Sequence, residues 1–70
     1  MKKTLLEFKR TTTITTQSIA RQAQLPVSVV FVVETGGFCS QDTAQRVVKA
    51  FNQLSGLQVR LEDIRFVQSQ

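Results

Sequence analysis

The sequence predicts a compact all-α domain of four to five helices, and two observations carry that prediction. The most regular pattern in the chain is helical: apolar residues recur every three or four positions in "SQDTAQRVVKAFNQLSG" (40–56). Glycine and proline punctuate the chain at Pro26, Gly36–Gly37 and Gly56, which separates four short blocks without internal repeats. The 70 residues, 41% of them apolar, suffice for one small core, so residues 1–70 form a single domain.

The block 40–56 has the residues that start a helix, an apolar stripe along one face and a glycine that ends it. Ser40 is a natural N-cap, Asp42 lies in the first turn, and Gly56 follows the last periodic residue. The expected buried stripe consists of Ala44, Val47, Val48, Phe51 and Leu54. The expected opposite, polar face consists of Gln45, Arg46, Lys49 and Asn52.

Two earlier blocks also favour helices. The pattern of "KKTLLEFKR" (2–10) favours a short helix. The β-branched run "TTTITT" (11–16) that follows it weakens the helical tendency. In "TTQSIARQAQ" (15–24), Thr15 or Thr16 can be the N-cap, and the narrow apolar stripe consists of Ile19, Ala20 and Ala23.

The valine-rich stretch "LPVSVVFVVETGG" (25–37) admits two interpretations. By propensity it is a strand, which would pair with "TTTITT" or "LQVRL" in a three-stranded α+β domain. By spacing it is a helix: Leu25, Val30 and Val33 can face a core together, Pro26 is tolerated in a first turn, and the Gly pair supplies a left-handed C-cap.

The tail "VRLEDIRF" (59–66) is equally ambiguous. It alternates like a strand from Val59 to Leu61, whereas Leu61, Ile64 and Arg65 suit one closing turn of helix.

The composition favours some classes of function and excludes others. Nine Lys and Arg against five Asp and Glu give a net charge of +4, which favours nucleic acid or another anionic partner. There is no His, the single Cys39 lacks a second cysteine, and no acid stands beside a plausible base or nucleophile, so we expect no enzyme, no cofactor and no metal. The apolar runs are too short for a membrane span, and "KRTTTITT" replaces the apolar region of a signal peptide, so a cytoplasmic protein is expected.

The order and spacing of residues 14–37, "ITTQSIARQAQLPVSVVFVVETGG", resemble the helix-turn-helix of the Cro/C1 (Xre-type) repressor family. The family commonly has Leu-Thr-Gln, then Leu-Ala, a turn, two buried positions in the recognition helix, and a Glu and a Gly after it. The matching residues are Ile14, Thr15, Thr16, Ile19, Ala20, Leu25, Val30, Val33, Glu34 and Gly36. Leu5, Phe8 and Lys9 resemble the first helix, and "LEDI" resembles the short fifth helix.

This resemblance implies a lambda-repressor-like DNA-binding domain with its helix-turn-helix at about 15–34. It implies a transcriptional regulator that acts as a homodimer, with a recognition helix, Pro26–Glu34, in the major groove of double-stranded DNA. It also implies an ion pair between Lys9 and Glu34. Gln24 stands where the family usually has Gly, so a left-handed residue there carries some strain.

The resemblance also implies a set of DNA contacts. Val27, Ser28, Phe31 and Val32 fall on the exposed side of the recognition helix, where bidentate base-reading side chains are missing. Valines can pack on thymine methyl groups, and Ser28 can make one hydrogen bond. Phosphate contacts are expected from Lys2, Lys3, Lys9, Arg10, Arg21, Thr16 and Thr35.

Two other interpretations of the valine face remain open. Val27, Phe31 and Val32 could form an apolar patch for a protein partner: a second copy, a toxin or a larger enzyme. Alternatively, these valines are simply core. The expected core consists of Ile14, Ile19, Leu25, Val30, Val33, Val47, Phe51 and Ile64.

Overall fold

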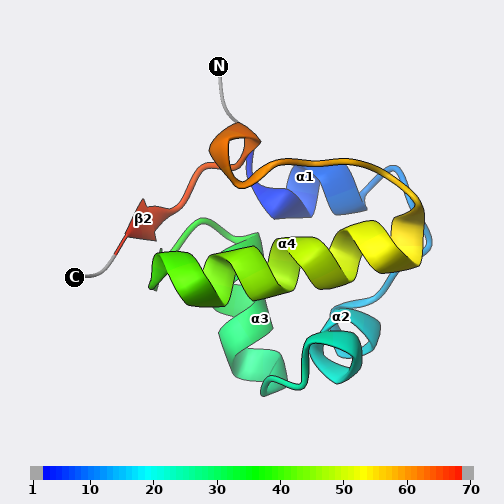
Figure 1. Cartoon of the computed structure of the whole chain (residues 1–70), viewed down its shortest axis with the longest axis horizontal. Coiled ribbons are helices and arrows are strands. Elements are labelled where there is room, and N and C mark those ends of the chain that lie inside the picture. The colour runs from blue at the N-terminus through cyan, green and yellow to red at the C-terminus, as the bar shows by residue number, and fades with distance from the viewer. Residues whose placement is uncertain (1–2, 69–70) are drawn as a thin grey trace.

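The computed structural model describes residues 3–68, which fold mainly into helices. The four α-helices are α1 (Leu5–Lys9), α2 (Thr16–Ala23), α3 (Val27–Glu34) and α4 (Gln41–Ser55). A 3₁₀ turn follows at Leu61–Asp63, and two short strands are β1 (Phe38–Cys39) and β2 (Val67–Gln68). Figure 1 shows α4 running through the middle of the molecule, with α1 on one side and α2 and α3 on the other.

The valine-rich stretch is a helix, and neither proposed partner segment forms a strand among the described residues. Pro26 precedes the first turn with φ −62° and ψ 146°, and its carbonyl accepts hydrogen bonds from the amides of Val29 and Val30. Val30 and Val33 are fully buried. The helix forms despite the β propensity of the valines because helical spacing places the Val30 and Val33 side chains on one face, where both are buried in the core.

The helix caps follow the sequence closely. The Ser40 hydroxyl accepts from the amide of Thr43 at 3.1 Å, and the Thr15 hydroxyl accepts from that of Ser18 at 3.1 Å, so Thr15 rather than Thr16 caps α2. Gly56 ends α4 in the left-handed conformation, with φ 78°. Gln24 is also left-handed, with φ 58°, as expected from the missing turn glycine.

The core lies where α4 crosses the other helices. Its largest fully buried apolar side chains are Phe51, Leu5, Ile19, Ile64, Val30, Val33 and Val47. Two expected core residues, Ile14 and Leu25, pack against its edge and are only partly buried. The prediction that Leu54 joins the buried stripe is wrong, because it is 40% exposed. The returning chain instead packs beside Asn52, whose amide group donates to the Val59 carbonyl and accepts from the Val59 amide.

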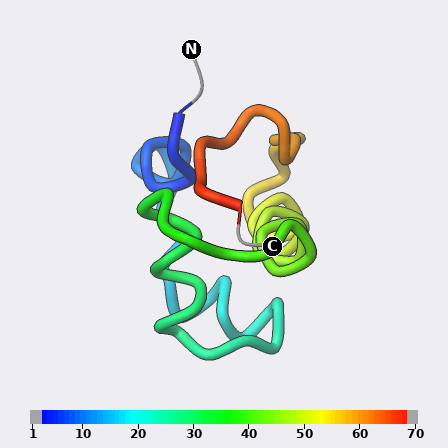
Figure 2. Tube along the Cα trace, turned by 90° about the vertical axis from the view of Figure 1, so that its left-hand side faces the viewer, coloured from blue at the N-terminus to red at the C-terminus, as the bar shows by residue number. Residues whose placement is uncertain are grey.

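Of the two alternatives for the tail, the closing turn of helix is present, as a 3₁₀ turn at Leu61–Asp63, and the strand over Val59–Leu61 is not. After the 3₁₀ turn the tail extends: the Arg65 amide donates to the Lys3 carbonyl at 2.8 Å, and the Val67 amide to the Gly37 carbonyl at 3.2 Å. β2 then pairs in parallel with β1, Phe38 opposite Val67. This small sheet corrects the all-α prediction to a helical domain with one strand pair. Figure 2 shows the tail lying between α1 and α4, on the side away from the α2–α3 turn.

Gly37 sits in a tight place between α3 and β1. Its amide donates to the Val32 carbonyl at 2.9 Å, and a Cβ added to it would lie 3.0 Å from the Val32 Cγ1 atom. A side chain at position 37 would therefore push on Val32. Within residues 3–68, none of the helices combines the length and apolar character needed to cross a membrane.

Candidate nucleic-acid interface

Helices α2 and α3 are joined by a three-residue turn, 24–26. The Leu25 amide donates to the Ala20 carbonyl at 3.0 Å, which closes the C-terminus of α2 around the left-handed Gln24. Ile19 of α2 and Val30 of α3 are both fully buried in the same core. The turn thus fixes α3 against α2 with one side of α3 facing inward.

A buried polar cluster ties three helices together. The Lys9 Nζ atom lies 3.1 Å from Glu34 Oε1 and donates to Thr16 Oγ1 at 2.7 Å, while Thr16 Oγ1 donates to the same Glu34 oxygen at 2.9 Å. Glu34 is 0% exposed and the Lys9 side chain 16% exposed. A buried carboxylate is tolerated only with such partners, so the cluster holds α1, α2 and α3 in register. The ion pair expected between Lys9 and Glu34 is present.

Two predicted phosphate ligands therefore have a part in the fold itself. The Lys9 ammonium and the single Thr16 hydroxyl proton both point to Glu34. A third, Thr35, is exposed, and its hydroxyl donates back to the carbonyls of Phe31 and Val32 at 3.0 and 3.2 Å.

The outer side of α3 is exposed and apolar. Val27 is 47% exposed, Phe31 55% and Val32 38%, and Ser28 is exposed beside them. The interpretation of the whole valine stretch as core is wrong for these positions. The four residues expected to face a groove or a partner share one accessible face.

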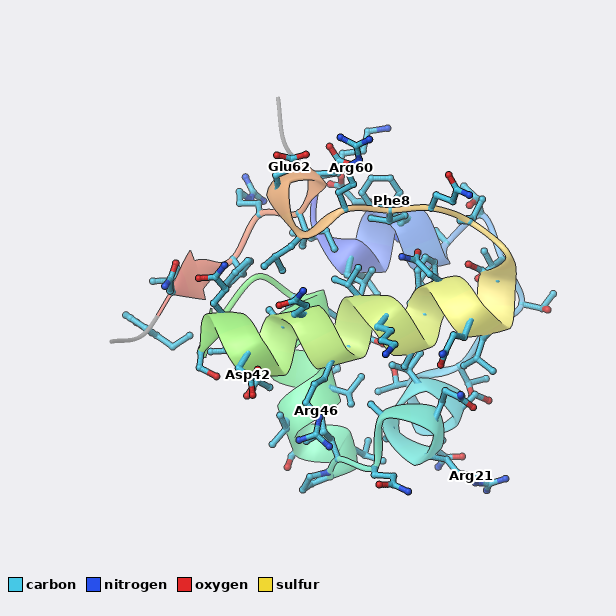
Figure 3. The ribbon with its side chains drawn as sticks, viewed as in Figure 1. Phe8, Arg21, Asp42, Arg46, Arg60 and Glu62 are labelled. Carbon is cyan, nitrogen blue, oxygen red and sulfur yellow. The ribbon has the colours of Figure 1, made fainter. Side chains whose placement is uncertain are left out.

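This face has no charge of its own. The sequence from Gln22 to Gln41 contains a single charged residue, Glu34, which is buried. Arg10, which follows α1, and Arg21 of α2 are exposed, and Figure 3 shows Arg21 pointing away from the body. Lys3 is exposed but bridges to Ile64 in the tail, and Lys2 lies outside the described residues. The positive charge thus borders the α3 face rather than covering it.

Two further residues complete the surroundings of α2 and α3. Arg46 is exposed on α4, as expected, and its guanidinium also donates to the Ala23 carbonyl at 2.9 Å, so that it reaches the end of α2 (Figure 3). Phe38 is 72% exposed next to α3, and the parallel strand pair that presents it has no local sequence signal. Cys39 beside it is buried, and this burial raises the pKa of its thiol, which keeps it protonated at neutral pH.

Among residues 3–68, no group of three or more His, Cys, Asp or Glu side chains is arranged to hold a metal ion. Comparisons with protein-family models, with curated proteins and with solved structures gave no match for this chain.

Proposed function

We propose that this chain is a DNA-binding transcriptional regulator, a repressor of the Cro/C1 (Xre-type) helix-turn-helix kind, with α3 as the helix that enters the major groove. The observation that carries the proposal is the Lys9–Thr16–Glu34 cluster, which joins α1, α2 and α3 at the positions where the family resemblance expects an ion pair. The short turn and the accessible outer side of α3 support it further.

In this proposal the groove contact is mainly apolar. Val27, Phe31 and Val32 pack on thymine methyl groups, and Ser28 supplies a hydrogen bond. Arg10 and Arg21 contact phosphates, while Lys9 and Thr16 act through the geometry of the cluster. With few base-edge hydrogen bonds, discrimination relies on A·T content and deformability, and two copies on a two-fold site read enough base pairs.

Selection from a random duplex library tests the proposal, with the enriched DNA titrated again at several salt concentrations. We expect a pseudo-palindromic, A·T-rich site whose affinity falls steeply with salt. Arg21→Gln should lower the salt slope by about one if Arg21 contacts a phosphate. The matched control is Arg60→Gln, because Arg60 is exposed at the opposite end of the molecule (Figure 3). The absence of any enriched sequence would contradict the proposal.

The uncharged outer face of α3 favours a second candidate function, a helix-turn-helix-derived protein-interaction module. Exposed apolar residues that lie together on a small protein commonly mark a partner site, and DNA-reading helices usually carry polar or basic side chains. If no duplex is enriched while Val32→Asp abolishes capture of a defined protein partner, this second function replaces the first.

A further inference from the structure

A groove of about 720 Å³ lies between the extended tail, residues 64–68, the 3₁₀ turn and the start of α4. Figure 2 shows the chain leaving α4, arching through the 3₁₀ turn and descending as the tail. The floor of the groove is apolar and comes from Leu61, Ile64 and Phe66. Its lining also includes the guanidinium groups of Arg60 and Arg65. The groove therefore combines an apolar surface with positive charge.

The tail borders this groove with an unused strand edge. The amides of Arg65 and Val67 donate to backbone carbonyls on the side of α1 and β1. Successive residues of an extended chain direct their N–H and C=O groups to opposite sides, so those of Phe66 and Gln68 point the other way, along the groove. Within residues 3–68 the Phe66 amide has no hydrogen-bond partner. Such an edge can accept one further strand.

The side chains of the tail alternate between two faces. Ile64 is buried and Phe66 is half-buried against the core, whereas Arg65 between them is exposed. Residues that lie side by side on neighbouring strands share a face, and opposite charges in such positions attract each other. A strand added here meets the apolar face with every second residue and Arg65 with a residue between. The alternation therefore favours a peptide in which apolar and acidic residues alternate.

The two arginines are free to bind carboxylates of a partner. Within residues 3–68 the Arg65 guanidinium forms no ion pair. Arg60 lies 3.3 Å from Glu62, but both side chains are well exposed, and such a pair contributes little stability. The chain has a net charge of +4, and its own Glu62 and Asp63 lie in the 3₁₀ turn rather than in an extended segment. The charge thus favours an acidic segment of another protein over a second copy.

We propose that this groove binds an extended peptide of another protein, with alternating acidic and apolar residues, as a third strand beside β2. The peptide backbone bonds to the outward groups of Phe66 and Gln68, and its apolar side chains cover Leu61 and Phe66. Its carboxylates accept hydrogen bonds from Arg65 and Arg60. About four residues are sufficient to cover the tail, because a strand rises about 3.3 Å per residue.

A peptide in this groove leaves α3 accessible. The groove lies on the side of the molecule away from the α2–α3 turn (Figure 2), and none of its lining residues belongs to α3. The inference therefore does not depend on the proposed DNA-binding function. If both hold, a copy bound to DNA through α3 can at the same time hold an acidic segment of another protein.

NMR titration of the isotope-labelled full chain with the peptide acetyl-Glu-Val-Glu-Val-Glu-Val-amide, in the absence of DNA, tests the proposal. We expect saturable shifts, centred on the Phe66 and Gln68 amides, below about 1 mM peptide. Arg65→Gln should raise the dissociation constant by about tenfold, because a charge-assisted hydrogen bond is lost. Arg21→Gln is the matched control: it removes the same charge from exposed α2, outside the groove, and should leave the dissociation constant unchanged.

Gln68→Pro separates strand addition from charge attraction. Proline lacks the amide that this edge offers, whereas the bond to the Gly37 carbonyl comes from Val67. The variant should bind the peptide about tenfold more weakly or worse although its charge is unchanged. Thermal melts establish that each variant is folded.

The absence of saturable shifts, shifts centred on α3, or an Arg65→Gln variant that binds as tightly as the parent would overturn the proposal. Equal binding of the matching Lys-Val peptide would overturn the acidic assignment, and equal binding by Gln68→Pro would overturn strand addition. If the chain instead self-associates through the groove, the same amides will shift with chain concentration alone, which would overturn the assignment to another protein.

Discussion

The inner and outer sides of α3 use the same kind of residue in opposite surroundings. On the inner side Val30 and Val33 are fully buried, together with Glu34, whereas on the outer side Val27 and Val32 are exposed. The helix thus reverses the usual amphipathic arrangement: its charged residue lies inside and an apolar face lies outside. Residue type alone does not reveal this reversal, because the rotation of the helix, set by the turn and the polar cluster, decides which valine meets water.

The largest expected effect comes from placing the same charge on each side. Val30→Asp should reduce the free energy of unfolding by at least about 3 kcal/mol, because it buries a carboxylate without a partner. Val32→Asp should change it by less than about 1 kcal/mol while abolishing binding to DNA or to a partner. Urea denaturation of both variants checks the difference. Equal losses of stability would mean that residues 30 and 32 do not differ in burial in solution.

A smaller effect is expected at the polar cluster that fixes the rotation of α3. Glu34→Gln removes the carboxylate that faces the Lys9 ammonium, so the free energy of unfolding should fall by about 1 kcal/mol or more. Glu62→Gln is the matched control, because the Arg60–Glu62 pair is well exposed and such pairs contribute little. Chemical denaturation curves of the two variants provide the measurement. A Glu34→Gln variant as stable as the parent would contradict a structural role for the pair.

The smallest effect is expected at the turn before α3. Gln24→Gly should raise the free energy of unfolding by about 0.5 kcal/mol, since glycine adopts φ 58° without the steric cost that Gln pays. Gln45→Gly, in the exposed interior of α4, should lower it by roughly 1 kcal/mol. Thermal unfolding of both variants shows whether their shifts have opposite signs. A destabilised Gln24→Gly variant would mean that the left-handed turn is not populated as described.

Local signals were sufficient for part of the fold and not for the rest. Ser40 and Gly56 marked the ends of α4 because caps act within one turn of the chain. The Lys9–Glu34 pair joins residues far apart in sequence, and only the family resemblance pointed to it. The β1–β2 pair was missed because two strands of two residues each have no periodicity to read, and their pairing is decided by where the tail lies after the helices pack.

Part of the candidate site could likewise be predicted from local sequence, and part depends on tertiary contacts. The outer positions of α3 follow from helical phase once α3 is a helix, so Val27, Phe31 and Val32 were placed at the surface correctly. The exposed position of Phe38 depends on the strand pair, and no sequence pattern signals that pair. The hydrogen bonds of Lys9 and Thr16 are tertiary contacts. The spacing of residues in the sequence therefore could not show that these two side chains hold the helices together, in addition to any contact with a phosphate.

The close approach of Gly37 to Val32 limits how this protein can change over generations. A Cβ at position 37 would lie 3.0 Å from the Val32 Cγ1 atom and 3.3 Å from the Val32 carbonyl oxygen, so a side chain there requires a small shift of residue 32, which a smaller residue at position 32 makes easier. Position 32 also faces outward, where any partner contacts it directly. The two positions are therefore expected to drift together, and a lineage that alters one inherits a restricted choice at the other.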